Sequence, residues 1–600
     1  MRYNIKNFFN SQFYLIGLMF TTCPVRTVIY WLLTAAVEAI PIVNVWIWKL
    51  ILDEMTLIYT GKEADGRVYL LLAAFLGLSL IASLFGNVKN FLKGEIADYS
   101  NRRLDEELMR QGARLESEYF NNPVNGGRIW WAQHSQRTVV QNFTWTVDTA
   151  LQIASFVTAA GLFLAYSPVF GVIFLITYIP GAVVLYRSGK KIENWQQWHA
   201  PDNVKKEYFK EMLISSKSAK DIRLYNLAPY LREKYDAIWS KLRREHSALF
   251  RESTVKAAAA SLLSCAGLAA VIVMSVRNLL NGSMAAIGTF SLYIGYAKTA
   301  GSSFSTIMNS VIRQYTVEAH RVRQYREFCT QPPLIPDNGT LEAPRMPRVE
   351  FRNVTFTYPT SDKPAIEDMS FVIEPGEVIG LVGVNGAGKT TIVRLLLRFY
   401  EPQSGEILLN GTDIRDFTMS SLWSVFGVCF QEVEHYAMKL RENVTLSDIT
   451  REDDMESVEW SARMSGLDKV MKNWEDGWDT MMTRGFADDG KELSGGQWQK
   501  IGLSRTFFGD ADIMILDEPS SALDAEAEDR IFSSFSELCR SKGGILISHR
   551  LSSVMMVDRI FFINGGQIVE CGSHEELMKN GGEYARLYKL QAEKYVGGAD

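Results

Sequence analysis

The stretch "EVIGLVGVNGAGKTTIVRLLLRFY" (377–400) decides the fold of the second half of this chain. It begins as an apolar strand, passes through a glycine-rich turn and ends as a helix. Within it, Gly383 to Thr390 fits the phosphate-loop pattern G-x-x-x-x-G-K-[ST]. The glycines let backbone N–H groups approach phosphates, Lys389 adds a positive charge, and the Thr390 hydroxyl can bind Mg²⁺. We therefore expect a nucleotide-binding α/β domain.

Two later apolar strands end in polar side chains. "ADIMILDEPSSALD" (511–524) supplies Asp517, placed to lie near Mg²⁺, and Glu518, which can polarise an attacking water. The alternative is that Glu518 only caps the following turn. "GGILISHR" (543–550) ends at His549. A lone histidine is more often structural, but strand ends in this fold class face the ligand crevice.

A second phosphate-competent stretch is "KELSGGQWQK" (491–500). Ser494, Gly495 and Gly496 precede a run that is expected to be helical. Glycines permit close backbone approach, and the free N–H groups of a first helical turn attract anions. The chain therefore carries two elements that suit phosphate.

The first half of the chain is predicted to span a membrane. A bilayer-crossing helix needs about 20 mostly apolar residues. Six segments qualify: 28–48, 68–88, 150–167, 168–186, 257–276 and 285–308. One or two could be buried helices of a soluble core, but soluble helices rarely stay apolar all round. The N-terminal segment is expected to be an amphipathic helix on the membrane surface.

Charge and composition set the topology and the domain limits. The loops 89–146 and 187–256 are long and rich in Lys and Arg, which places them and the N-terminus inside. A Pro- and Gly-rich stretch follows the spans. We predict an all-α six-helix transmembrane domain (1–330), a linker (331–347) and an α/β P-loop ATPase domain (348–600). Six scattered cysteines without a CxxC pair indicate reduced thiols.

These motifs, in this order, resemble the ATPase domain of ABC transporters, and the whole chain resembles an exporter-type half-transporter. The resemblance implies ATP and Mg²⁺ as cofactors and catalytic roles for Glu518 and His549. It assigns Mg²⁺ to Thr390, Gln431 and Asp517. The residues that it assigns to the nucleotide, from the adenine-stacking aromatic to the D-loop, are Tyr358, Gly383, Asn385, Gly386, Gly388, Lys389, Thr390, Thr391, Gln431, Ser494, Gly496, Gln497 and Asp524.

In that family two ATPase domains pair head to tail, and each LSGGQ closes over the nucleotide of the partner. The resemblance therefore implies a homodimer, with a heterodimer as the alternative. "TRGFADDGKELSGGQWQK" (483–500) resembles a bacterial subgroup that includes lanthipeptide exporters. We expect ATP-driven export of a hydrophobic or amphipathic substrate, peptides included, by alternating access in a bacterial cell membrane, with the ATPase domain cytoplasmic.

Other functions stay open at this point. An exporter-fold importer, a lipid flippase and an ATP-gated regulator without a pumped substrate share the same motifs. A soluble ABC ATPase acting on nucleic acid is disfavoured by the six spans, and a net charge of −5 gives no general case for nucleic-acid binding. Membrane lipid and a second chain are the expected partners.

Two charges fall inside predicted spans. Glu38 lies in the first and Lys298 in the sixth. A charge at mid-membrane costs roughly 2.5–3.5 kcal/mol on insertion scales. Our hypothesis is that Glu38 faces a cavity and binds cationic or amphipathic cargo. The alternatives are that Lys298 reaches an interface, that a neutral Glu38 bonds backbone freed by Pro41, or that the two pair structurally.

Overall fold

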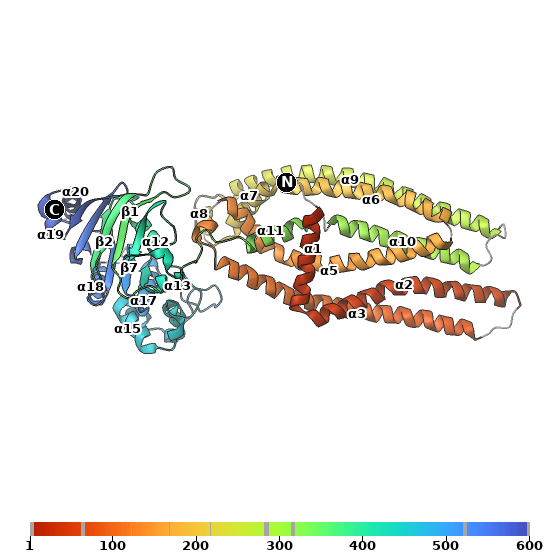
Figure 1. Cartoon of the computed structure of the whole chain (residues 1–600), viewed down its shortest axis with the longest axis horizontal. Coiled ribbons are helices and arrows are strands. Elements are labelled where there is room, and N and C mark those ends of the chain that lie inside the picture. Colours follow the sequence, from red (N-terminus) through yellow and green to blue (C-terminus); the bar gives the residue numbers. More distant parts are fainter. Residues whose placement is uncertain are drawn as a thin grey trace. The chain divides into compact units, whose positions relative to one another are not determined.

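The computed structural model describes residues 5–61, 66–121, 123–166, 168–216, 218–280, 287–313, 319–519, 525–551 and 553–596. The chain divides into two compact units, Met1–Pro333 and Leu334–Asp600. The first is helical, and the second contains both β-sheets of the described chain (Figure 1).

Long helices dominate the first unit. The six predicted spans lie along α2, α3, α5, α6, α9 and α10. The helices of this unit are α1 (Ile5–Thr22), α2 (Pro24–Tyr59), α3 (Arg67–Gly112), α4 (Ser117–Asn121), α5 (Pro123–Tyr166), α6 (Pro168–Trp198), α7 (Ala200–Ile214), α8 (Ala219–Leu224), α9 (Ala228–Leu280), α10 (Ile287–Arg313) and α11 (Ala319–Cys329).

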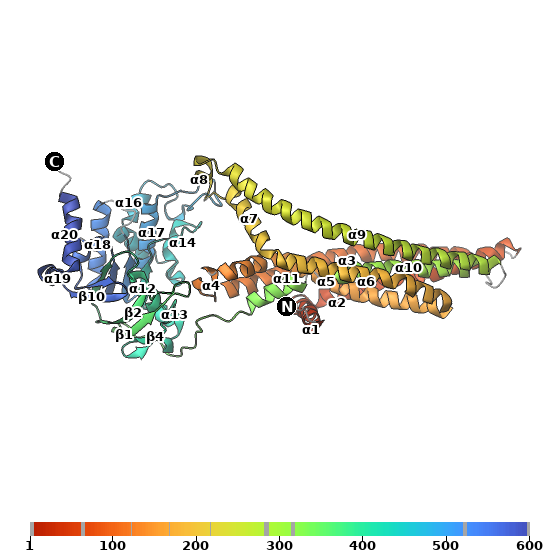
Figure 2. The same ribbon diagram turned by 90° about the horizontal axis from the view of Figure 1, so that it is seen from above.

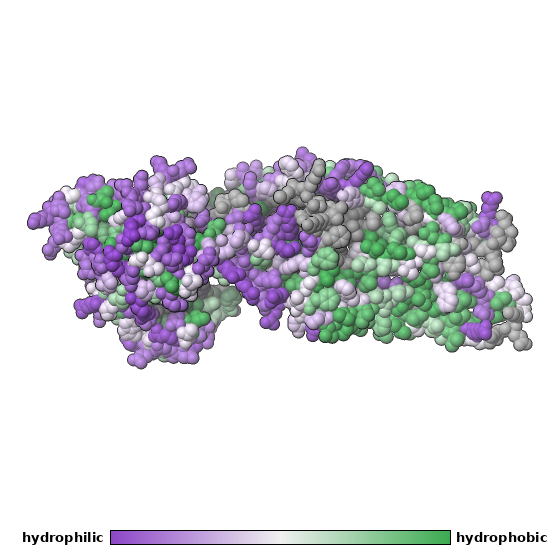
Figure 3. All heavy atoms as spheres, in the orientation of Figure 1, coloured by the Kyte–Doolittle hydropathy of each residue, from purple (hydrophilic) through white to green (hydrophobic). Residues whose placement is uncertain are grey.

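Four of the described helices are long and apolar enough to cross a membrane. They are the helices with apolar segments in Pro24–Tyr59, Arg67–Gly112, Pro168–Ile192 and Ala228–Leu280. In α5 the apolar part, Val147–Leu162, is shorter, and α10 carries Lys298 among several Gly, Ser and Thr residues. On the face seen in Figure 3, apolar side chains gather over much of this unit, and polar side chains gather over other parts of it. The unit is that of a multi-pass membrane protein.

The long helices pack in pairs, α2 with α3, α6 with α9, and α5 with α10 (Figures 1 and 2). Helix α1 crosses this arrangement. Its Leu15 and Met19 are fully buried in a cluster that contains Tyr30 and Tyr325, whereas Phe13 is exposed. The apolar side chains Leu15 and Met19 of α1 are therefore covered by the protein's own helices, and a position of α1 on the membrane surface stays a prediction.

Two sheets form the second unit. An antiparallel sheet has the order β2 (Ile366–Ile373), β1 (Val349–Phe356), β4 (Ser404–Leu409), β5 (Thr412–Asp413). A six-stranded sheet has the order β10 (Gln567–Gly572), β9 (Arg559–Asn564), β3 (Val378–Gly383), β8 (Gly543–Ile547), β7 (Ile513–Asp517), β6 (Phe426–Cys429). All its pairs are parallel except β9 with β10.

Nine α-helices are described in this unit. They are α12 (Lys389–Leu396), α13 (Met419–Ser424), α14 (Leu440–Thr445), α15 (Met455–Ser465), α16 (Leu467–Met471), α17 (Gly495–Phe508), α18 (Ala525–Cys539), α19 (His574–Asn580) and α20 (Glu583–Val596).

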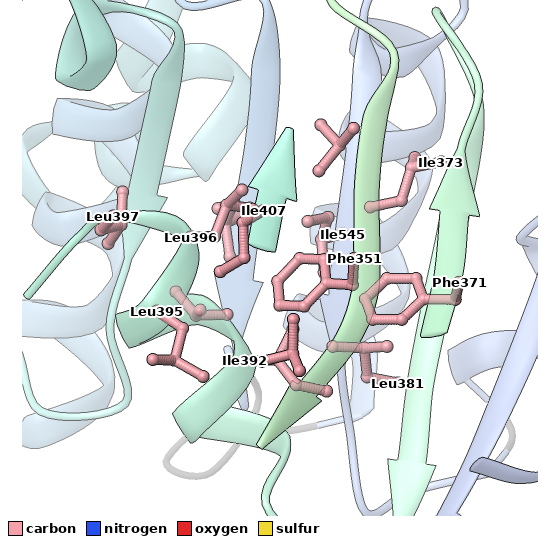
Figure 4. Packing of buried hydrophobic residues seen from close by; sticks show 14 of the residues in the cluster. Phe351, Phe371, Ile373, Leu381, Ile392, Leu395, Leu396, Leu397, Ile407 and Ile545 are labelled. Atoms are coloured by element: carbon pink, nitrogen blue, oxygen red, sulfur yellow. The ribbon is translucent and has the colours of Figure 1, made fainter. Parts of the chain in front are cut away.

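The core between the two sheets fixes the position of α12. Phe351 stacks on Phe371 with ring centroids 4.5 Å apart, beside Ile392 and Leu395 of α12 (Figure 4). The predicted linker, 331–347, contributes to this unit, because Thr340 N and Leu341 N both donate to Asp416 O. The phosphate loop joins β3 to α12, and both of these elements pack into the core of this unit.

Candidate active site at the strand ends

The loop between β3 and α12 admits only glycine at two positions. A Cβ on Gly383 would lie 2.1 Å from Ile563 O, and one on Gly388 would lie 2.6 Å from Ala365 O. Gly388 also has φ +104°, which side chains rarely adopt. These glycines bring the loop backbone close to the sheet, and its N–H groups precede the first turn of α12.

Lys389 is a buried cation in this loop. Its side chain is 6% exposed, and Nζ donates to Gly383 O at 2.9 Å and to Val384 O at 3.2 Å. Burial lowers the pKa of Lys389, while the nearby carboxylates of Glu518 and Asp517 oppose that shift. Among the described residues, only the neutral carbonyls of Gly383 and Val384 accept its hydrogen bonds, so an anionic phosphate would be a stronger partner.

Asp517 and Thr390 offer adjacent oxygen atoms. Thr390 Oγ1 donates to Asp517 Oδ2 at 3.1 Å, and Asp517 is 2% exposed at the end of β7. Burial raises the pKa of Asp517, and the bond from Thr390 opposes this effect. A carboxylate and a hydroxyl are the oxygen ligands that Mg²⁺ takes, so these residues fit that ion.

Glu518 is held at both its backbone and its carboxylate. Its φ is +49°, the left-handed region that a non-glycine residue occupies at a cost. Its N–H donates to Ile547 O at 2.9 Å, and Gln499 Nε2 donates to its carbonyl at 3.3 Å. The backbone contacts therefore stabilise the conformation that points the carboxylate at the strand edge.

Two predicted residues meet the carboxylate of Glu518. Gln431 Nε2 donates to Oε2 at 3.0 Å, and His549 Nδ1 lies 3.2 Å from the same oxygen. Three segments remote in sequence therefore converge on one atom. A carboxylate oriented in this way is suited to accept a proton from water.

The LSGGQ stretch begins α17 with a capping box. Gln497 N donates to Ser494 Oγ at 3.4 Å, and Ser494 N donates to Gln497 Oε1 at 2.9 Å. Trp498 is 2% exposed and stacks on His435, with ring centroids 4.2 Å apart. The first turn of α17, which includes Gly496, is therefore fixed by its own cap and by the segment that follows Gln431.

The remaining predicted residues surround the phosphate loop or lie outside the described chain. The Tyr358 hydroxyl is 3.1 Å from Thr391 Oγ1, and its ring packs edge-on against Phe356 and Tyr400. Asn385 and Gly386 are exposed at the loop tip, and Gly386 has φ +80°. Asp524 falls in 520–524, outside the described residues.

Sequence reasoning missed Gln499. This side chain is 3% exposed and links α17 to the backbone of Glu518. A glutamine that falls between the buried Trp498 and Ile501 on a helix was the available signal. Its partner could not be inferred, because the two residues lie on separate elements.

The fold and the site define the class as a P-loop ATPase unit joined in one chain to a multi-pass membrane unit. Residues 366–521 match the family described as ABC transporter. Residues 366–521 thus form an ABC transporter ATPase domain, and one helical membrane unit followed by one such domain fits the half-transporter architecture that the sequence predicted. It binds ATP, and its ATP hydrolysis is coupled to transport.

Several known proteins resemble the chain. The subtilin transport ATP-binding protein SpaT of Bacillus subtilis is 27% identical over 93% of this chain and 90% of that protein. The ATP-dependent lipid A-core flippase of Methylobacillus flagellatus is 33% identical over 62% of this chain and 61% of its own length. The Escherichia coli K12 flippase is 39% identical over 40% of this chain and 41% of its own length.

A solved structure supports the fold. A bacterial Atm1-family ABC exporter with ATP bound superposes with a TM-score of 0.79, covering 95% of this chain and 99% of that one. The sequence identity is 21%, so the likeness concerns the fold alone. The predicted fold class, a helical membrane domain followed by an ABC ATPase domain, is confirmed.

The geometry of Lys389 generates the first prediction. Lys389→Ala should weaken ATP binding by about 10- to 100-fold, because a charged hydrogen bond to phosphate is lost. Titration of the full-length protein with a fluorescent ATP analogue measures this change. Lys472→Ala removes an exposed lysine of the same unit and serves as the control. Equal affinities for both variants and the wild type would contradict the role of Lys389.

Proposed function

We propose that the chain is one half of a dimeric, ATP-driven exporter of the bacterial cell membrane, with its ATPase unit cytoplasmic. The proposed cargo is hydrophobic or amphipathic, and a peptide is favoured by the likeness to the subtilin transporter along most of both chains. The observation that carries this function is the convergence of Gln431 and His549 on Glu518 beside the phosphate loop.

Each site residue has a proposed role in hydrolysis. Lys389 and the loop glycines hold the phosphates, and the Tyr358 ring faces adenine. Thr390, Asp517 and Gln431 hold Mg²⁺, which supplies charge neutralisation on the phosphates. Glu518 accepts the proton of the attacking water, and His549 orients the Glu518 carboxylate. Gln499 keeps the Glu518 backbone in its left-handed conformation.

The dimer is proposed from the motif content. One chain holds one phosphate loop and one LSGGQ stretch. In the proposed assembly Ser494, Gly496 and Gln497 bind the nucleotide of the partner. Nucleotide binding closes the dimer and hydrolysis reopens it. Intact catalytic motifs favour two copies of this chain over a heterodimer.

The polar residues around Glu38 in the helical unit support a cargo that carries a positive charge. Lys89 Nζ lies 3.1 Å from Asp148 Oδ1, which also accepts a 2.8 Å bond from the Tyr30 hydroxyl. The half-buried Glu38 interacts electrostatically with Lys89 and Asp148 and through a side-chain hydrogen bond with Gln152. Since Asp148 balances Lys89, Glu38 is the acid in excess.

One alternative from the sequence was that Lys298 and Glu38 form a structural pair. In the structure Lys298 is exposed on α10, and no ion pair joins it to another described residue. A structural ion pair with Lys298 therefore does not account for the presence of Glu38 inside a predicted span. We propose the cavity role, and the alternative is a neutral Glu38 that hydrogen-bonds backbone freed by Pro41.

A lipid flippase is the second candidate. The flippases are more identical over the segments they share, but those segments span less than two thirds of their lengths, 61% and 41%. ATPase assays in liposomes with lipids, drugs and cationic peptides separate the candidates, because the transported class should stimulate hydrolysis. Absence of stimulation by every class would favour a regulator.

Glu518→Gln should reduce ATP turnover by roughly 100-fold or more while ATP binding persists, as expected when a positioned general base is lost. The variant should also trap a closed dimer. Turnover by the reconstituted protein and nucleotide binding are measured together. Glu475→Gln changes an exposed glutamate of the same unit and should leave turnover unchanged. Near wild-type turnover in Glu518→Gln would remove this residue from the mechanism.

Mixed dimers test whether LSGGQ acts on the partner. Ser494→Arg and Lys389→Ala should each be inactive alone, for steric and electrostatic reasons respectively. Coexpressed, they should recover roughly a quarter of the wild-type sites, because about half of random dimers are mixed and each has one intact site. The ATPase activity of the unfractionated dimers purified after coexpression measures this recovery. No recovery would show that each chain completes its own site.

Glu38→Gln should weaken cargo stimulation of hydrolysis while basal hydrolysis and folding persist, because the excess negative charge is removed. The measurement is ATPase activity in liposomes with cationic peptides. Glu54→Gln, the same change farther along α2, is the control. Unchanged stimulation in a stable Glu38→Gln protein would exclude the cavity role, and an unstable protein would favour a structural role.

A further inference from the structure

A cavity of about 440 Å³ lies between α6 and α9 in the helical unit. Helix α6 packs against part of the longer helix α9 (Figures 1 and 2). The volume lies in the range of small-molecule and headgroup sites. Nothing in the hydrolysis mechanism or in the Glu38 cluster uses this cavity.

The cavity wall carries three cations and one anion. Arg187 and Lys191 come from α6, and Glu252 and Lys256 come from α9. Lys191 Nζ and Lys256 Nζ lie 2.8 Å and 2.5 Å from the same oxygen of Glu252. Both lysines therefore share one carboxylate, and the lining has a net charge of about +2.

Arg187 is the cation in excess. Within the described part of the chain, no carboxylate lies within ion-pair distance of Arg187, although the residue is exposed and lines the cavity. The hydroxyls of Ser188 and Ser253 line the same space. A planar guanidinium with hydroxyl groups nearby matches the oxygens of a phosphate.

The cavity lies where the apolar segments end. Arg187 directly follows the predicted span 168–186, and Lys256 directly precedes the predicted span 257–276. Val183 and Val184, which belong to the end of the span 168–186, also line the cavity, as do Ile192 and Leu249. A ligand that fills this site therefore meets both cationic and hydrocarbon side chains.

We propose that this cavity binds the headgroup of an anionic phospholipid, with the phosphate on Arg187, Lys191 and Lys256 and an acyl chain along Val183 and Val184. The proposed membrane orientation assigns it to the cytoplasmic leaflet, where basic pockets between transmembrane helices bind anionic headgroups. The cavity and its charges do not depend on that orientation. A soluble anion would use the cations but gain nothing from the valines.

The charge of Arg187, unpaired among the described residues, is not expected of an ion network whose only role is structural. A network that only joined α6 to α9 would be complete with Lys191, Glu252 and Lys256. Arg187 adds a charge that the protein does not neutralise, in a space that the protein does not fill. Arg187→Gln breaks no ion pair, so it tests ligand binding with the least disturbance of folding.

Native mass spectrometry of the detergent-purified protein, titrated with dioleoyl phosphatidylglycerol or dioleoyl phosphatidylcholine, tests the site. The wild type should bind one phosphatidylglycerol more tightly than any phosphatidylcholine. Arg187→Gln should weaken that binding about fivefold, and Arg187→Gln with Lys256→Gln about 30-fold, from about 1 kcal/mol per cation. Arg187→Lys should restore most of the affinity.

The matched control is Lys190→Gln with Arg251→Gln. These exposed residues lie on the same two helices, carry the same charge and do not line the cavity. The control should keep wild-type affinity for phosphatidylglycerol. Equal weakening by the control, or wild-type affinity in the double cavity variant, would overturn the proposal.

Competition with inorganic phosphate shows whether the cavity binds a lipid headgroup or a soluble phosphate ion. At 10 mM, a value on the order of cytosolic anion levels, phosphate should not displace phosphatidylglycerol, because Val183 and Val184 add affinity only for lipid. Displacement by phosphate would assign the cavity to a soluble anion and overturn the lipid proposal. If the double variant is not monodisperse, Arg187→Gln alone decides between these outcomes.

Discussion

The parallel pairing of β3, β8 and β7 is the constraint on which the ATPase site depends. Leu381 of β3 and Asp517 of β7 both pair with Ile547 of β8, so β7 and β8 end at the same level and β3 ends two residues later, at Gly383. The phosphate loop, the two carboxylates and His549 then leave the sheet at one edge. A slip of one residue in β7 would turn Asp517 to the opposite face of the sheet.

The strand, loop and helix around 377–400 could be predicted because the residue types that bind phosphate must be consecutive. The capping box of α17 is also a local pattern, because its two residues, Ser494 and Gln497, are three positions apart in the sequence. The left-handed backbone of Glu518 could not be predicted, because glutamate has no preference for that conformation. It is imposed by Gln499 and Ile547, which sit on other elements.

In the helical unit the apolar runs indicated where membrane crossings lie but not where helices end. The apolar pattern stops at the membrane boundary, while helical hydrogen bonding continues through charged sequence such as that of α3 and α9. Glu38 and Lys298 were visible as charges inside spans. The grouping of Glu38 with Lys89 and Gln152 needed the packing of three helices and could not be read from one.

The length of α9 has a mechanical consequence. Its 53 residues form one continuous helix, about 80 Å long at 1.5 Å per residue, and no proline occurs after its first turn. Helix α6, its neighbour, contains Pro180 and so lacks one backbone hydrogen bond there. Helix α9 is therefore expected to be stiff along its length, whereas α6 can bend near Pro180. A tilt of about 5° in α9 moves its far end by about 7 Å, which converts a small rotation at one end into a displacement on the scale of a side chain at the other.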